Sequence, residues 1–232
     1  MNSASKNFLR GICPPFLWQA ARHLRSSIGS SSQVASLKSP GEDMRWHSEL
    51  TELLERWGEG NAWDEVRMLF MQRSGTALDI GCGTGRVMEI LSENSRLHIT
   101  GCDVTEEYLN EAKARGISAD RLALGDARSL KFADKSFDYS YSVGINHFFS
   151  LQDLRKAIPE FLRVTRKFTA HHIAVSRSGI DEGWCETYYR FQNNSCQSWL
   201  NEFREFFPSV YVVDSKWSDS FSVGKWIVAS CE

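Results

Sequence analysis

The chain has 232 residues, of which 42% are hydrophobic and 24% charged, and its formal net charge is -2. This balance is typical of a globular protein with one sizeable core, and it excludes a general attraction to polyanions, so we expect no nucleic-acid partner. Six scattered cysteines without a C-x-x-C pair indicate reduced thiols instead of a disulfide scaffold or a zinc site. The absence of an apolar run of about 18 residues and of a signal-peptide pattern predicts a cytoplasmic protein without a membrane span.

The first 41 residues differ in composition from the rest. They contain no Asp or Glu against five Lys and Arg, and the apolar residues after Pro14 recur at helical spacing. Residues 26–32, rich in Ser and Gly, indicate a flexible linker. We predict a basic N-terminal extension over residues 1–41 and one domain over residues 42–232. Two roles of the extension stay open: weak, peripheral contact of residues 1–30 with a membrane surface, or a helix docked on the domain.

From residue 76 onward, short apolar runs alternate with amphipathic segments. The expected strands are 76–80, 97–102, 122–124, 137–143 and 172–176, and the expected helices between them are 86–91, 105–115 and 151–166. This alternation predicts an α/β domain with a parallel sheet and helices on both faces. After a helix over 196–207, the runs 210–213 and 223–229 are separated by a short connection, so we expect them to form an antiparallel hairpin.

The strongest motif lies at the first strand-to-helix turn, where Asp79 precedes Gly81, Gly83 and Gly85. Glycines at such a turn let a ligand approach the backbone, and the following helix offers free N–H groups. A dinucleotide-binding fingerprint requires a further glycine at position 86, which is Arg86 here. The spacing therefore argues against an NAD-dependent oxidoreductase.

Carboxylates also follow the next two strands. Asp103 comes about 20 residues after the glycines, where a carboxylate can accept hydrogen bonds from both hydroxyls of a ribose. Asp126 closes the third strand, where it can accept from an adenine amino group. A single Asp at a strand end is often only a helix cap, but these signals occur together, in order and at the expected spacing.

With these motifs, residues 76–176 resemble the class I S-adenosylmethionine-dependent methyltransferase family, in its small-molecule branch. The resemblance implies a Rossmann-like, mostly parallel sheet of seven strands with a C-terminal antiparallel hairpin, and S-adenosyl-L-methionine as cofactor. The helical pattern after Pro14 and over residues 42–70 adds N-terminal helices to this fold. It places the methionine part of the cofactor at the glycine turn, the ribose at Asp103, and the adenine at Asp126 and Ala127. The cofactor-binding residues that it implies are Asp79, Gly81, Cys82, Gly83, Gly85, Asp103, Val104, Asp126, Ala127, Ser142 and Val143.

The acceptor side is expected after the fourth strand, around Asn146 and His147. His147 is a candidate general base because its ordinary pKa lies in a useful range, and packing is the alternative role. The stretch 176–194 reads as a loop in which aromatic rings stand beside amides and charges, a composition that suits a saccharide, although packing of a surface loop explains it equally well. The candidate acceptor-binding residues are Asn146, His147, Arg177, Trp184 and Tyr188. His171 and His172 lack a third clustered ligand, so we expect no metal.

We therefore predict an enzyme that transfers a methyl group to a small or medium-sized acceptor, with O-methylation of a saccharide or related metabolite as the specific hypothesis. A non-catalytic nucleotide-binding or scaffolding protein that retained the fold is the alternative, and the presence of Asp103 and Asp126 argues against it. The Pro-Pro-aromatic signature of base amino methylation is absent after the fourth strand, where the sequence is Ser142-Val143-Gly144-Ile145.

Overall fold

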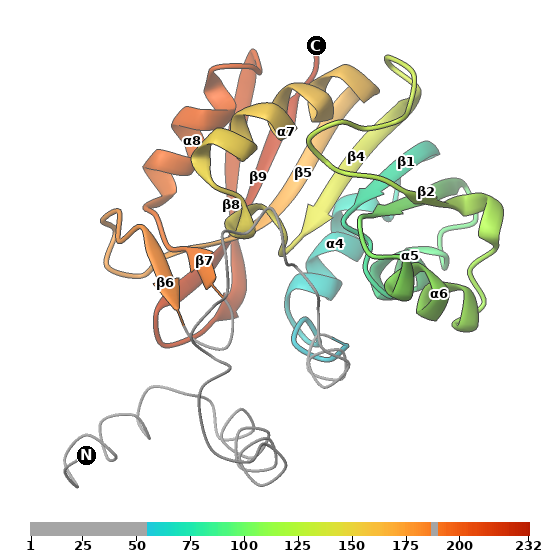
Figure 1. Cartoon of the computed structure of the whole chain (residues 1–232), viewed down its shortest axis with the longest axis horizontal. Helices are drawn as coiled ribbons and strands as arrows, with labels where there is room; N and C mark the ends of the chain where they lie inside the picture. The colour runs from blue at the N-terminus through green and yellow to red at the C-terminus, as the bar shows by residue number, and fades with distance from the viewer. Residues whose placement is uncertain (1–54, 187–189) are drawn as a thin grey trace, which may run out of the picture.

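The computed structural model describes residues 55–186 and 190–232 and contains one central seven-stranded sheet (Figure 1). The strand order is β3-β2-β1-β4-β5-β9-β8, with β9 antiparallel to both β5 and β8 and the other pairs parallel. The strands are β1 (Gly75–Ile80), β2 (Leu97–Asp103), β3 (Leu122–Leu124), β4 (Phe137–Val143), β5 (Thr165–Ser176), β8 (Ser209–Ser218) and β9 (Ser222–Ser230). The predicted mostly parallel sheet with a C-terminal antiparallel hairpin is confirmed.

Helices cover both faces of the sheet. One face carries α4 (Ala62–Phe70), α5 (Arg86–Leu91) and α6 (Glu106–Ala114), and the other carries α7 (Leu151–Val164) and α8 (Cys196–Arg204). Buried side chains of consecutive strand residues alternate between the two layers, as a pleated strand requires. Ala77 of β1 lies in the α4 layer and Leu78 in the α7 layer, whereas Phe137 of β4 lies opposite Tyr139 because the register of β4 shifts between these two residues. Among the described helices, none is long and apolar enough to cross a membrane.

The fold differs from the predicted elements in the second half of the chain. β5 begins at Thr165 directly after α7, so the expected end of the helix at residue 166 and start of the strand at residue 172 were wrong. Asp138 on β4 attracts Arg166 and Lys167, at 3.7 and 3.3 Å, which holds this charged segment beside β4 as a strand. α8 also ends three residues before the predicted residue 207.

The sequence predicted a loop over residues 176–194, but the structure has a pair of strands within this stretch. It contains β6 (Trp184–Glu186) and β7 (Arg190–Gln192), which form an antiparallel pair. β7 packs against the short 3-10 helix η3 (Asn146–Phe148), which follows β4. The extension at residues 1–41, with its predicted helix and its two proposed roles, lies outside the described residues.

Candidate active site

The glycine turn after β1 folds back onto the end of β2. The backbone N–H groups of Gly81 and Cys82 both donate to the carbonyl oxygen of Cys102, at 2.7 and 3.0 Å. This arrangement places the glycine loop, residues 81–85, at the carboxyl edge of the sheet, between the ends of β1 and β2. In an open parallel sheet, ligands bind outside this edge at the point where the strand order reverses, which here is between β1 and β4.

The three glycines of the loop have different surroundings, although all have positive φ. An added Cβ atom would lie 2.6 Å from the Ile145 side chain at Gly81 and 2.3 Å from Ile117 at Gly85, so packing already requires glycine there. At Gly83 such an atom would meet nothing within 4 Å. Gly83 therefore faces open space. Of the three glycines, it is the one at which packing does not require the absence of a side chain, so this absence keeps the space beside the loop open.

Asp79 lies at the end of β1 and is buried, with no hydrogen-bond partner for its Oδ2 atom in the described part of the chain. Burial raises the pKa of Asp79 to about 8, the nearby Asp103 charge adds to the rise, and the Tyr141 hydroxyl opposes it. A buried carboxyl oxygen without a partner is costly, because it has lost water without gaining a donor. A cationic ligand would satisfy this group, and its side chain lies directly before the glycine loop.

Asp103 connects the end of β2 to the glycine loop. Its Oδ2 accepts a hydrogen bond from the Gly83 N–H at 2.9 Å, and its Oδ1 accepts one from the Thr105 N–H at 2.9 Å. Burial raises the pKa of Asp103, and the two backbone N–H donors partly offset this rise because they stabilise the ionised carboxylate. A carboxylate has about four acceptor positions, so each oxygen keeps one for an incoming hydroxyl group.

Asp126 follows β3 and is already paired. The Arg128 guanidinium donates to Oδ2 at 2.6 Å and to Oδ1 at 3.0 Å, and holds the pKa of Asp126 below its ordinary value. Arg128 also contacts Asp153 at 3.2 Å. An adenine amino group at Asp126 would share an oxygen with this arginine. The next residue, Ala127, is buried in the core beneath α7.

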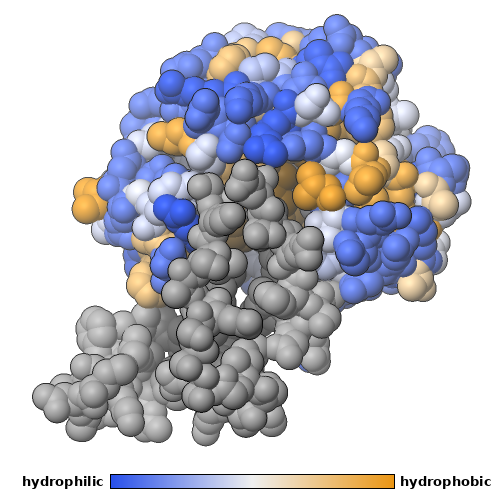
Figure 2. Space-filling view, viewed as in Figure 1, coloured by the Kyte–Doolittle hydropathy of each residue, from blue (hydrophilic) through white to orange (hydrophobic). Residues whose placement is uncertain are grey.

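The ends of β2 and β3 expose apolar surface. Val104 and Leu124 are about half exposed, at 50% and 53%. Figure 2 shows hydrophobic residues gathered on the right half of the visible face, within a largely hydrophilic surface. A flat, apolar ring such as adenine fits such a surface. The sequence had suggested Val104, and it missed Leu124, whose strand is too short to show on which side the side chain lies.

The side chains of Ser142 and Val143 do not reach this edge. Ser142 is fully buried, and its hydroxyl lies 2.7 Å from Nδ1 of His171, in a hydrogen-bonded group with Thr169, Ser140 and Thr165 beneath α7 and α8. Val143 packs in the opposite layer with the α4 side of the core. Only the backbone of these two residues remains available to a ligand.

After β4, the chain places several polar side chains in buried positions without partners. Asn146 is fully buried, and neither its amide nitrogen nor its amide oxygen has a hydrogen-bond partner in the described residues. The Nδ1 atoms of His147 and His172 are likewise unpartnered. Burial lowers the pKa of both imidazoles to about 3, so they are uncharged near neutral pH. This acceptor side is therefore polar but neutral.

The remaining candidates for acceptor binding lie farther along the chain. The Arg177 guanidinium donates to the carbonyl oxygens of Asp219 and Ser222, at 2.6 and 3.4 Å, and so holds the β8–β9 turn. The Trp184 ring is covered by the Arg190 guanidinium, 4.6 Å from its centroid. Tyr188 lies outside the described residues. The structure thus gives Arg177 a structural contact and brings Asn146 and His147 to the strand ends.

A pocket of about 370 Å³ lies between the 181–194 stretch and α8. It is lined by carboxylates and amides together with aliphatic and small groups: Leu151, Asp181, Glu182, Gly183, Gln192, Asn194, Ser198, Asn201 and Glu202. Phe191, which precedes Gln192, lies 6.2 Å from His147 between ring centroids, so β7 separates the pocket from the acceptor side. Within the described residues, no group of three His, Cys, Asp or Glu side chains is placed to hold a metal ion.

Comparison with known proteins agrees with this geometry. Residues 77–167, which run from β1 into β5, match the family model described as a methyltransferase domain. A methyltransferase of Thermotoga maritima that depends on S-adenosylmethionine has the same fold, with a TM-score of 0.59 over 78% of this chain and 92% of that protein, at 20% identity. Residues 77–167 therefore carry a methyltransferase domain, as predicted from the motifs, on the fold of class I S-adenosylmethionine-dependent methyltransferases, whose cofactor is S-adenosylmethionine.

Two curated relatives share part of the chain. The "Probable tRNA methyltransferase 9B" of Homo sapiens is 36% identical over 109 residues, 46% of this chain and 23% of that protein. The ubiquinone/menaquinone biosynthesis C-methyltransferase of Paracoccus denitrificans is 42% identical over 96 residues, 38% of this chain and 37% of that protein. The chain therefore spans well under half the length of these relatives.

The described residues fit the implied cofactor. Gly83 leaves room for close approach, Asp79 offers an unpartnered carboxyl group to a cation, and Asp103 keeps free acceptor positions for ribose hydroxyls. Val104 and Leu124 offer apolar surface to the adenine ring. These residues lie at the ends of β1, β2 and β3, on one edge of the sheet.

Proposed function

We propose that the protein transfers a methyl group from S-adenosylmethionine to a small or medium-sized acceptor. The observation that carries this proposal is the buried Asp79 Oδ2 atom without a hydrogen-bond partner, directly before a glycine loop in which Gly83 faces open space and donates its N–H to Asp103. A scaffold that had lost the activity would have no use for a buried carboxyl group without a partner, which only costs stability.

The chemistry needs alignment more than activation. Bound S-adenosylmethionine supplies a methyl group on a positively charged sulfur, which is already electrophilic. Asp79 would pair with the positive charge of the methionine part, Asp103 would hold the ribose, and the exposed apolar residues would exclude water from the adenine. Holding the acceptor in line with the methyl group is then the main contribution of the protein.

The buried polar groups after β4 support a neutral, hydroxyl-bearing acceptor. The Asn146 amide can both donate and accept, and the uncharged imidazoles of His147 and His172 each leave Nδ1 unpartnered. An imidazole with a pKa of about 3 holds a proton weakly, so we propose that His147 orients the acceptor hydroxyl group instead of storing its proton. This role replaces that of general base, for which the sequence had made His147 a candidate.

Saccharide O-methylation remains our specific proposal for the acceptor. The pocket beside α8 lies across β7 from His147, so its carboxylates and amides would hold a part of a polyhydroxylated acceptor distant from the methylated hydroxyl group, and the Asp181 and Glu182 carboxylates would repel a phosphate backbone. The relatives act, by their names, on tRNA or a quinone precursor, but the family match ends at residue 167. Asn146 and His147 lie within the match, whereas His172 and the pocket residues after Leu151 follow it.

The test incubates the purified chain with S-adenosylmethionine labelled on the methyl group and with three acceptor pools: saccharide-containing cell extract, total tRNA and a lipid extract containing quinols. Label in the saccharide fraction supports the proposal, and label in tRNA or quinol would overturn the saccharide. The Asp103→Ala variant is the matched control for label that does not depend on the site. Cofactor binding without transfer to any pool would favour the scaffold.

A further inference from the structure

A short segment before α4, residues 55–57, is hydrogen-bonded to the glycine loop. The Glu55 carboxylate accepts a hydrogen bond from the Thr84 hydroxyl and forms an ion pair with Arg115, whose Nη2 lies 2.6 Å from Oε2. Arg115 in turn donates from Nε to the Thr84 carbonyl oxygen at 3.0 Å. Glu55, Thr84 and Arg115 thus form a closed triangle of polar contacts, and both charged side chains are only 22% exposed.

Two residues later, the same segment reaches the acceptor side. A Cβ atom at Gly144 would lie 3.4 Å from the Trp57 ring and 3.9 Å from His147. The Trp57 ring also packs against His172, with ring centroids 5.5 Å apart, and stands at right angles to Trp217 at 5.9 Å. Trp57 therefore forms an apolar wall beside the unpartnered Nδ1 atoms of His147 and His172.

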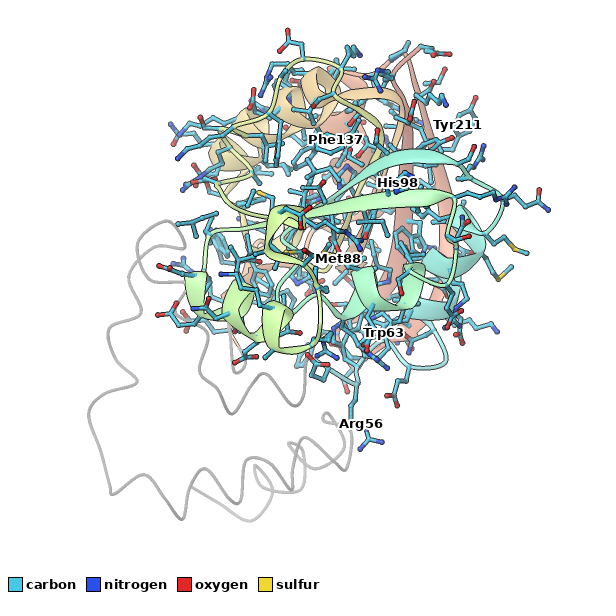
Figure 3. The ribbon with its side chains drawn as sticks, turned by 90° about the vertical axis from the view of Figure 1, so that its right-hand side faces the viewer. Arg56, Trp63, Met88, His98, Phe137 and Tyr211 are labelled. Carbon is cyan, nitrogen blue, oxygen red and sulfur yellow. The ribbon has the colours of Figure 1, made fainter. Side chains whose placement is uncertain are left out.

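These contacts define a path across the site. Thr84 lies in the glycine loop after β1, and Gly144 directly follows β4, the neighbouring strand. Residues 55–57 join the two, so they cross the gap between the strand ends next to Gly83. Arg56, between the two contact residues, points away from the fold (Figure 3) and pairs only loosely with Glu59, at 3.8 Å.

We propose that residues 55–57 complete the methyl-transfer site. Glu55 is a positioning residue that fastens this segment over the methionine part of the cofactor and stiffens the glycine loop through Thr84. Trp57 is a specificity residue that offers its ring to an apolar face of the acceptor. This inference rests on the proposed function, because it assigns roles within that site, and it names residues that lie outside the matched methyltransferase domain.

The test measures how fast S-adenosylhomocysteine leaves the chain, by stopped-flow tryptophan fluorescence. Glu55→Gln keeps the shape of the side chain and removes the charge, so we expect dissociation about tenfold faster, the effect of losing one charge-assisted contact. Glu59→Gln is the matched control, because it lies on the same segment and pairs with Arg56 at the surface. We expect the control to dissociate like the unmodified chain.

The contact between Glu55 and Arg115 is tested by coupling. Arg115→Gln should accelerate dissociation at least as much as Glu55→Gln, because it also loses the hydrogen bond to the Thr84 carbonyl oxygen and the ion pair with Glu89, and the double variant should resemble Arg115→Gln. Trp57→Phe should reduce the fluorescence change on binding, while Trp184→Phe should leave it intact. A dissociation rate in Glu55→Gln equal to that of Glu59→Gln would overturn the inference. Failure of the unmodified chain to bind S-adenosylhomocysteine would instead overturn the proposed function.

Discussion

The Asp103 carboxylate, at the end of β2, accepts a hydrogen bond from the backbone N–H of Gly83 at 2.9 Å. The residue proposed to hold the ribose therefore also fixes the glycine loop that borders the methionine part. Because both carboxylate oxygens already accept backbone hydrogen bonds, the Asp103 side chain is held in place before any ligand arrives. This preorganisation lowers the entropy cost of binding.

Asp103→Ala should weaken S-adenosylmethionine binding by roughly 1–3 kcal/mol, the cost of leaving ribose hydroxyls and the Gly83 N–H unpaired. Titration calorimetry measures the affinity. Asp120→Ala is the control, since Asp120 is exposed and bonds only locally to Ser118. An affinity of the Asp103→Ala variant equal to that of the control would remove Asp103 from the site.

Gly83→Val and Gly85→Val should separate binding from folding. Both glycines have positive φ, so both variants carry backbone strain of about 1–2 kcal/mol. Only at Gly85 does the new side chain also strike Ile117 and Ala112. We expect Gly83→Val to stay folded and lose cofactor binding, and Gly85→Val to lose thermal stability. Thermal scans and calorimetry on both variants check this, and unfolding of Gly83→Val would make that glycine structural.

Cofactor affinity should depend on the Asp79 proton. With a pKa of about 8, Asp79 is protonated near neutral pH, and a bound cation favours its ionised form, so binding should release a proton. Affinity for S-adenosylhomocysteine should rise from pH 6 to about 7.5, a range below the ordinary pKa of an α-amino group. Calorimetry in buffers of different ionisation enthalpy counts the protons. Asp79→Asn should remove the dependence, and a flat profile in the unmodified chain would contradict the assignment.

The sequence predicted those site residues whose position follows from the local pattern of apolar runs, glycines and strand ends. The glycines follow an apolar run, and Asp79 and Asp103 stand at strand ends, so their place at the sheet edge follows from chain order. Glu55 was missed because its contact to Thr84 joins residues 29 positions apart, and no local period signals it. Ser142 was assigned to the cofactor from its place near the end of β4 alone. The direction of its side chain depends on the packing of α7 and α8 against that face of the sheet, which no local pattern in the sequence shows.

The position of Ser142 leads to a fourth prediction. Ser142→Ala should leave cofactor affinity unchanged and reduce stability by about 1–3 kcal/mol, because it strands Nδ1 of the buried His171. Ser129→Ala is the control at an exposed hydroxyl group. Chemical denaturation measures the free energy of unfolding, and calorimetry the affinity. If affinity falls while stability is kept, the side chain belongs to the cofactor site after all.

Thermal stability of the ligand-free chain should be greatest near pH 6.5. Burial lowers the pKa of His147, His171 and His172 to about 3, so the unfolded chain binds more protons below the ordinary value of 6.5. The stability that these residues contribute is present above pH 6.5 and is lost as the pH falls from 6.5 toward 3.

Asp79 acts in the opposite direction. Its pKa in the folded chain is about 8 against an ordinary value of 3.8, so the folded state holds an extra proton between these values. Stability from this group therefore declines as the pH rises from 3.8 to 8. Below pH 6.5 the stability gained from the three histidines as the pH rises is larger than the stability lost from Asp79. Between pH 6.5 and 8 only the loss from Asp79 remains, so stability has its maximum near pH 6.5. Thermal midpoints from pH 4.5 to 9 measure the curve. Asp79→Asn should flatten the alkaline side of the curve and steepen its acid side, and a midpoint of the unmodified chain that keeps rising through pH 8 would show that Asp79 ionises freely in the fold.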